Sequence, residues 1–392
     1  MTETERWLLP EGIDELLPEQ AEQIEFLRRS ILKLYQRWGY RYVMTPMLEH
    51  LDSLLVGTGN DLAQSTFKLT DEMTGRLLGV RADITPQVSR IDAHRLQQEG
   101  PSRLCYAGPV LLTRPRELGG SRNPIQIGAE LYGHGGIESD IEVVELMLSS
   151  LKRADLSVNS LDLGHVGIFR ELIKQFNINQ SLEAKLFDAL QRKAKSDIQE
   201  LLPAESANCQ EMFVALIELN GEEEVFEQAK TRLAHANQSV FDAIQELDDI
   251  YQGLKKRCPE VAVHFDLAEL RGYQYHTGLV FAAYVPGYWQ AIAQGGRYNE
   301  VGRVFGRARS ATGYSMDLRA VCELLPPYQS STTNIFAPAE DDPELEEKIH
   351  ALRDAGESVI RELPGQIGDA ESYNCNRVLV KQNNQWQIKN RE

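Results

Sequence analysis

The chain has 392 residues, of which 42% are hydrophobic and 25% charged, as in an ordinary soluble globular protein and unlike a disordered or fibrous chain. The sequence holds no apolar run near the ~20 residues that span a bilayer, and its first residues lack the pattern of a secretion signal. With 41 Lys and Arg against 58 Asp and Glu, the net charge is −17, which disfavours a dedicated nucleic-acid-binding surface.

Residues 18–38 carry apolar side chains at three- and four-residue steps, which predicts an amphipathic helix. Its stripe consists of Ile24, Leu27, Ile31, Leu34 and Trp38. Gly39 is expected to end this helix. The β-type run that follows holds Pro46, which a central strand does not tolerate at a hydrogen-bonding position. Pro46 therefore predicts a strand end, a sheet edge or a contact between subunits.

The next elements alternate between β-type and helical patterns. The sequence predicts a hairpin at 66–83, a helix at 85–98, strands at 103–112 and 124–132 joined by an Arg- and Gly-rich loop, a helix at 140–153 and a strand at 160–166. Strand patterns return at 261–285 and 288–296, and a last helix follows a glycine-containing stretch. Between them, residues 167–257 are amphipathic and poor in β-branched runs, which predicts a helical insertion.

The C-terminal part is set off by the Pro-, Ser- and Thr-containing segment 326–334, which we interpret as a linker. Residues 335–392 predict a small α/β tail with a helix at about 343–355. The sequence therefore predicts an α+β fold: an antiparallel sheet flanked by helices in residues 1–325, a helical insertion, and the small C-terminal tail.

Four segments carry the groups that a pocket for an amino acid requires: a carboxylate for the α-ammonium, an Arg for the α-carboxylate, and polar partners for a side chain. These segments are 81–87, 126–130, 270–278 and 295–298. Gln126 and Glu130 are four residues apart on a predicted strand and so share one face. Taken singly, such residues are more often solvated charges and turn residues, and their spacing does not bring the four segments together.

Six segments follow one another along the chain: PEGIDELLP, GYRYVMTPMLE, RADITPQVSR, QIGAELYG, LRGYQYHTGLVF and GGRYNEV. In these segments and in their order, the chain resembles the catalytic domain of histidyl-tRNA synthetase, a class II synthetase. The resemblance covers about residues 8–325 and rests on the combination, since GGRY alone is a weak signal. It implies the class II fold. Residues 25–49 resemble the family's motif 1, which implies a dimer interface that includes Pro46.

The resemblance also implies a histidine pocket, in which Asp83 and Gln126 hold the α-ammonium and Arg271 approaches the carboxylate. Glu130 and Tyr298 face the imidazole. The pocket further includes three residues of the same segments: Thr85, Tyr275 and His276. His276 stands where synthetases carry Tyr, Tyr275 is expected on the opposite face of a regular strand, and Asp83 replaces a longer Glu.

The departures are larger where ATP is bound in the synthetases. The motif 2 arginine that clamps the α-phosphate corresponds to Leu112, which offers neither charge nor donor. The motif 3 arginine corresponds to Ala320, with Arg319 one residue early and so about 100° around the helix. Asp317 adds a negative charge in place of a glycine. An active adenylating enzyme is not expected.

With these departures, and with a short C-terminal remnant in place of an anticodon-binding domain, the chain resembles one paralogue family. This family is the regulatory subunit of ATP phosphoribosyltransferase of histidine biosynthesis. That resemblance implies no reaction in this chain, no cofactor, no tRNA and no membrane. It implies a dimer that joins the short-form catalytic subunit in a cytoplasmic hetero-octamer, activates it and makes it sensitive to histidine. Whether histidine binds the pocket, the subunit interface or the partner stays open. An active histidyl-tRNA synthetase, a stand-alone amino-acid-binding module and a pseudo-synthetase fragment of a stress kinase are the alternatives.

The sequence predicts neither a disulfide framework nor a metal site. The five cysteines are scattered and form no CxxC pair, which fits a reducing compartment. His165, His235 and His264 are isolated, and we interpret them as structural residues rather than metal ligands.

Overall fold

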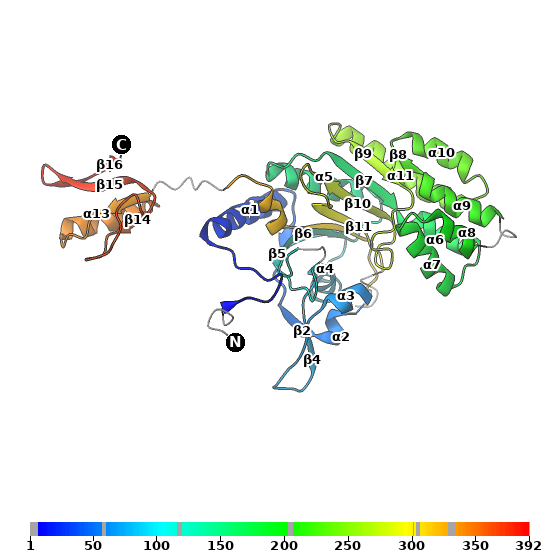
Figure 1. Cartoon of the computed structure of the whole chain (residues 1–392), viewed down its shortest axis with the longest axis horizontal. Coiled ribbons are helices and arrows are strands. Elements are labelled where there is room, and N and C mark those ends of the chain that lie inside the picture. Colours follow the sequence, from blue (N-terminus) through cyan, green and yellow to red (C-terminus); the bar gives the residue numbers. More distant parts are fainter. Residues whose placement is uncertain are drawn as a thin grey trace. The chain divides into compact units, whose positions relative to one another are not determined.

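The computed structural model describes residues 7–56, 60–115, 120–202, 207–300, 302, 306–327 and 334–391. The chain divides into two compact units, Met1–Pro326 and Pro327–Glu392 (Figure 1). Most of the expected linker, residues 328–333, lies outside the described residues, as do residues 116–119 of the Arg- and Gly-rich loop.

The helices and strands follow the order expected for an α+β protein. The helices are α1 (Pro18–Arg37), α2 (Leu51–Leu54), α3 (Asn60–Ser65), α4 (Thr85–Arg90) continued by a π-helical turn (Ile91–Leu96), α5 (Ile137–Arg153), α6 (Val166–Gln175), α7 (Gln180–Gln191), α8 (Lys195–Leu201), α9 (Ala207–Glu218), α10 (Glu224–Arg232), α11 (Gln238–Arg257), α12 (Leu318–Glu323) and α13 (Pro343–Asp354). The strands are β1 (Arg41–Tyr42), β2 (Leu48–His50), β3 (Lys68–Thr70), β4 (Leu77–Val80), β5 (Ser102–Pro109), β6 (Ile125–Tyr132), β7 (Ser160–His165), β8 (Asn220–Gly221), β9 (Val263–Asp266), β10 (Leu279–Tyr284), β11 (Ala293–Arg297), β12 (Ala311–Asp317), β13 (Asn334–Ala337), β14 (Val359–Arg361), β15 (Cys375–Gln382) and β16 (Gln385–Asn390).

The centre of the first unit is a nine-stranded sheet in the order β1-β5-β6-β12-β11-β10-β7-β9-β8. Its neighbouring strands pair antiparallel except for β1 with β5 and β7 with β9. A separate antiparallel sheet, β2-β4-β3, contains the expected hairpin. This mainly antiparallel sheet with helices packed against it confirms the predicted α+β class.

In helix α1, the predicted apolar stripe faces the core of the first unit. Ile24, Leu27 and Ile31 are buried as expected, and Tyr35 is also fully buried in the same core. Leu34 and Trp38 lie at the edge of this core and are only partly buried. Gly39 follows the helix with a φ of +82°, a left-handed conformation that glycine adopts without strain.

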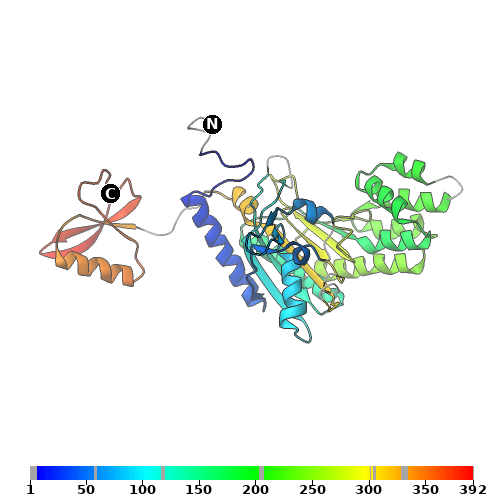
Figure 2. The same cartoon turned by 90° about the horizontal axis from the view of Figure 1, so that it is seen from below.

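Helices α6–α11, which we call the helical region, gather at one end of the nine-stranded sheet (Figures 1 and 2). Helix α11 packs against α5, α6 and β7, which joins the helical region to the sheet. The predicted helical character of residues 167–257 is confirmed: in 167–202 and 207–257, the parts that the structure describes, the two-residue strand β8 is the only strand.

One predicted strand is wrong. Residues 271–278, which we call the pocket loop, form turns between β9 and β10 instead of continuing a strand. Gly272 has a φ of +63°, and its carbonyl accepts the backbone N–H groups of Tyr275 and His276 at 2.7 Å. This turn interrupts the ladder, so Tyr275 and His276 do not alternate across a strand as expected.

The second unit is a four-stranded sheet, β14-β13-β15-β16, with α13. A core of its own holds it together, made of Ile335, Ala337, Leu345, Ile349, Val359, Leu379 and Trp386.

Candidate functional site

A cavity of about 610 Å³ opens on the nine-stranded sheet and reaches the helical region. Segments far apart in the sequence line it: the start of α4, strands β6 and β10–β12, the pocket loop, and Phe187 and Gln191 of α7. Its polar lining includes seven of the expected site residues, Asp83, Thr85, Glu130, Arg271, Tyr275, His276 and Tyr298.

Glu130 forms the base of this cavity. Its carboxyl group accepts hydrogen bonds from the Thr85 hydroxyl at 3.0 Å, from the Tyr106 hydroxyl at 3.1 Å and from the Tyr298 hydroxyl. Burial raises the pKa of this carboxyl to about 8, and the negative charge of Asp83 adds to the effect, while the hydroxyl donors oppose it. At pH 7 this carboxyl therefore holds its proton for most of the time, so it can donate a hydrogen bond to a ligand as well as accept one.

Tyr106 was not expected at this site. It lies on β5 directly opposite Gly128 of β6, and a Cβ atom on Gly128 would come within 2.5 Å of the Tyr106 hydroxyl. The signal in the sequence was the glycine itself, because a glycine inside a strand often marks a place where another group approaches closely.

Gln126 lies behind the cavity wall. Its amide oxygen accepts the backbone N–H of Ile84 at 2.9 Å, and its amide nitrogen donates to Asp83 at 2.8 Å and to the Ser315 hydroxyl at 3.2 Å. The side chain is buried and fully engaged in these bonds. The structure therefore places Gln126 as the support of Asp83, and Asp83 as the carboxylate that lines the cavity.

The pocket loop brings two aromatic side chains to the opposite wall. The His276 Nδ1 lies 3.1 Å from the carbonyl oxygen of Arg271, and burial lowers the pKa of the imidazole to about 4, so the ring is neutral at pH 7. In the neutral ring, Nδ1–H is then the donor and Nε2 an acceptor. The Tyr275 ring lies 4.9 Å from that of Tyr298, and its buried hydroxyl has no hydrogen-bond partner among the described residues.

Arg271 lies between this cavity and a second one of about 520 Å³. Its guanidinium donates to the Tyr284 hydroxyl at 3.2 Å and lies 3.5 Å from the Glu269 carboxylate. Burial opposes the charge, but Glu269 and Tyr284 outweigh it and raise the pKa of Arg271. A permanently charged group is thus available to both cavities.

The second cavity contains the two positions that the sequence resemblance aligns with the phosphate-binding arginines of synthetases. Leu112 and Ala320 line it, and Leu112 is only 3% exposed. Arg319 also lines it, but its guanidinium donates at 2.6 Å to the Asn123 side chain and at 3.1 Å to the carbonyl oxygen of Asp14. The side chain is therefore used to hold the N-terminal segment against the core.

Asp317, which replaces a glycine of the synthetases, and Arg114, two residues after Leu112, have other surroundings. The Asp317 carboxylate accepts the backbone N–H groups of Arg319 at 2.9 Å and Ile125 at 3.0 Å, so it caps α12 and ties it to β6. Arg114 is exposed and lines neither cavity.

Pro46 lies between β1 and β2, where its carbonyl oxygen accepts the Gln87 side chain at 2.9 Å. Apolar side chains around it face outward: Met44 is 79% exposed, Met47 40% and Leu48 43%.

Two further features of the described residues concern metal binding and membrane crossing. In the part of the chain that it describes, no cluster of three or more His, Cys, Asp or Glu side chains is placed to hold a metal ion. None of the described helices combines the length and the apolar character needed to cross a membrane.

Comparisons with known proteins identify relatives of both units. Residues 12–321 match the histidyl-tRNA synthetase family, and residues 332–389 match the C-terminal domain family of the ATP phosphoribosyltransferase subunit HisZ. A crystal structure described as an ATP phosphoribosyltransferase regulatory subunit/histidyl-tRNA synthetase from Bacillus halodurans superposes with a TM-score of 0.84 at 28% identity, covering 95% of this chain and 97% of that one. A histidyl-tRNA synthetase from a Nostoc species, at 16% identity, a TM-score of 0.75 and coverage of 98% and 94%, shares the fold.

Sequence relatives extend over both units. The ATP phosphoribosyltransferase regulatory subunit of Pseudomonas entomophila is 49% identical over 398 residues, covering 99% of each chain. That of Alkalilimnicola ehrlichii is 53% identical over 378 residues, covering 95% of this chain and 94% of the relative. At this identity over almost the full length, the chain belongs to the family of ATP phosphoribosyltransferase regulatory subunits.

Proposed function

We propose that the chain is the non-catalytic regulatory subunit of ATP phosphoribosyltransferase in histidine biosynthesis. It joins the short-form catalytic subunit in a cytoplasmic hetero-octamer built on dimers of this chain, activates that subunit and transmits inhibition by histidine. The exposed apolar side chains around Pro46 support the dimer, since motif 1 of the related synthetases is an interface segment.

The observation that carries the non-catalytic part is the state of the second cavity. Adenylate formation needs positive groups where charge develops at phosphorus, and such a group is worth several kcal/mol in a transition state. Here Leu112 and Ala320 occupy the two arginine positions, and Arg319 is held by Asn123 and Asp14. We therefore expect neither histidine activation nor aminoacylation of tRNA by this chain.

The first cavity supports a role for histidine as ligand. In this proposal Asp83, which Gln126 supports, binds the α-ammonium, and Arg271 binds the α-carboxylate; the position of both in the cavity lining supports these roles. Glu130, which Tyr298 and Thr85 hold by hydrogen bonds, is the proposed partner of the imidazole. Tyr275 and His276 close the opposite wall.

Regulation then follows from linkage. A ligand that binds one state of an assembly better than another shifts the partner's activity by its difference in affinity, and a tenfold effect needs only about 1.4 kcal/mol. In this proposal, histidine binds the amino-acid pocket with different affinity in the two states of the assembly, since the pocket no longer serves a catalytic step.

The test is to mix the purified chain with a short-form catalytic subunit. We expect the rate of phosphoribosyl transfer to rise on mixing and to fall again when histidine is added, whereas the catalytic subunit alone shows neither response. Unchanged rate and unchanged histidine sensitivity on mixing would contradict the proposal. Histidine-dependent pyrophosphate exchange by the chain alone would favour an active synthetase, and histidine binding without association with the catalytic subunit would favour a stand-alone binding module.

A further inference from the structure

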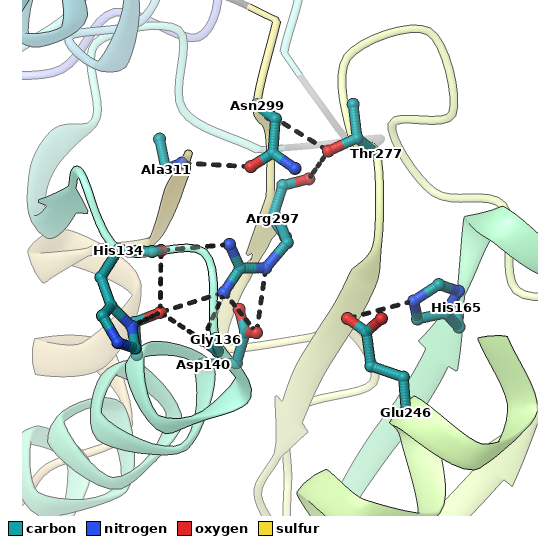
Figure 3. A network of polar contacts seen from close by, with 10 residues as sticks. His134, Gly136, Asp140, His165, Glu246, Thr277, Arg297, Asn299 and Ala311 are labelled. Atoms are coloured by element: carbon teal, nitrogen blue, oxygen red, sulfur yellow. Dashed lines mark hydrogen bonds and ion pairs between the residues drawn. The ribbon is translucent and has the colours of Figure 1, made fainter. Parts of the chain in front are cut away.

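Besides the pair His165–Glu246, Figure 3 shows a network of polar contacts around Arg297 that includes Thr277 of the pocket loop. It begins at β11, whose last residue Arg297 directly precedes Tyr298 of the cavity wall. Because neighbouring side chains on a strand leave opposite faces, the Arg297 side chain points away from the cavity and reaches the start of α5.

Arg297 is anchored in α5 by a buried ion pair. Its guanidinium donates to the Asp140 carboxylate at 2.6 and 3.0 Å, to the carbonyl oxygen of Gly136 at 2.9 Å and to the Ser139 hydroxyl at 3.0 Å. The two charged side chains are 4% and 0% exposed. The Arg297 carbonyl oxygen in turn accepts the backbone N–H of Thr277 at 2.7 Å, so this anchor holds the pocket loop.

His165 holds the same loop from the neighbouring strand. It ends β7 opposite Leu279 of β10, and the next backbone N–H, of Val166, donates to the carbonyl oxygen of Gly278 at 3.0 Å. The His165 side chain is 6% exposed, and neither ring nitrogen has a hydrogen-bond partner among the described residues. Its Nε2 lies 3.6 Å from the carboxylate of Glu246 on α11.

Glu246 therefore contacts one support of the pocket loop, His165, and acts on the other, Arg297, only through its charge. Its interaction with His165, and the positive charge of Arg297 behind it, lower the pKa of the Glu246 carboxyl against the effect of burial. Burial raises the pKa of Asp140, and Glu246 adds to this while Arg297 opposes it. The charges of Asp140, Arg297 and Glu246 thus influence one another.

The outer side of the pocket loop touches the helical region as well. The Tyr273 hydroxyl donates to the Glu183 carboxylate of α7 at 2.7 Å, and its carbonyl oxygen accepts the Arg170 guanidinium of α6 at 2.6 Å. The Tyr273 ring also lies 5.5 Å from that of Phe187, which itself lines the cavity.

From these contacts we infer that the pocket loop couples occupancy of the cavity to the position of the helical region. Glu246 and Glu183 act as positioning residues. Glu246 acts on the loop through His165, and Glu183 acts on it through the Tyr273 hydroxyl. A ligand that contacts Arg271 and His276 acts on a loop that is bonded to α6 and α7 through Tyr273 and is linked to α11 indirectly through His165, so its binding energy depends on the position of those helices. By linkage, the position of the helices then depends on the ligand to the same extent. The inference rests on the proposed function for the identity of the ligand, histidine.

The test uses the full chain without its partner. Glu246→Gln removes the charge behind the loop at constant size, and Tyr273→Phe removes only the hydroxyl that donates to Glu183. Asp249→Asn is the matched control, because Asp249 lies on the exposed face of the same helix α11. Histidine affinity is measured by calorimetry, and amide hydrogen exchange of the pocket loop, α7 and α11 is compared with and without histidine.

We expect histidine to slow exchange in the wild-type pocket loop and also in α7 and α11. In Glu246→Gln and Tyr273→Phe the loop should still be protected, the protection that histidine adds to the helices should shrink, and the affinity should fall about five- to tenfold. A merely structural role would speed exchange in the helices equally with and without histidine. The control should match the wild type.

The inference is overturned if histidine protects the wild-type loop but not the helices, or if both variants keep wild-type affinity and helix protection. If the wild-type chain binds no histidine at all, the ligand assignment in the proposed function fails first and this inference fails with it. The two failures are therefore distinguishable in one set of measurements.

Discussion

At Glu130, the surroundings of a single residue determine the pKa of its carboxyl group. Three hydroxyl groups donate to its carboxyl group, and burial raises its pKa from 4.5 to about 8. The native carboxyl thus holds its proton over a pH range in which the unfolded chain has already released it. Its contribution to stability is complete below pH 4.5 and is lost as the pH rises through about 8.

The replacement Glu130→Gln tests this environment. Because the amide cannot ionise, the variant should gain thermal stability relative to the wild type as the pH is raised from about 5.5 to about 8.5. The measurement is the difference between the two melting temperatures at each pH. Glu99→Gln, at an exposed position, serves as control and should show a constant difference. A constant difference for Glu130→Gln as well would mean that the carboxyl is ionised in the native state.

Residue types and strand period predict part of such a site. The period of two placed Gln126 and Glu130 on one face, and both side chains do point from β6 toward α4. The period could not tell which of them lines the cavity, because that depends on Ser315 and Ile84, which bond to the Gln126 amide from other elements. Arg319 is a second example, since its partners Asp14 and Asn123 are about 200 to 300 residues away.

The pocket loop is the element on which sequence patterns failed, and for a definite reason. Its β-rich composition favours a strand, but Gly272 allows a positive φ that starts a turn. Helices were predicted more reliably, because the apolar period of α1 or α11 is set within the element itself. The conformation of a loop depends instead on contacts with other elements, such as the bond from Thr277 to Arg297.

Gly272→Ala tests the turn. A Cβ atom at this position would lie 2.5 Å from the His276 ring, and the φ of +63° adds a backbone cost of roughly 1–2 kcal/mol. We expect a lower melting temperature together with a loss of histidine affinity. Gly287→Ala is the matched control: its φ of +81° carries the same backbone cost, but no atom lies within 4 Å of the added Cβ. It should lower the melting temperature and leave the affinity intact, and equal losses of affinity in both variants would contradict the role of the turn.

At the scale of the whole molecule, the chain consists of two units, and each unit has its own buried side chains. The cores of the first unit lie within Met1–Pro326, and the core of the second contains only residues beyond it. The sequence indicated a break from the linker composition and a small tail. It could not show that the tail has a buried core, because that core depends on β13, β15 and α13 meeting in space.

Separate cores predict separate stabilities. Leu345 is fully buried in the second unit, so Leu345→Ala should cost about 2–5 kcal/mol there, enough to unfold a domain this small. Since the first cavity is lined by residues of the first unit alone, histidine affinity should stay within about twofold of wild type. Calorimetric unfolding should show loss of one transition and retention of the other. A chain ending at Pro326 should behave in the same way, and loss of histidine binding in either protein would mean that the two units are not energetically independent.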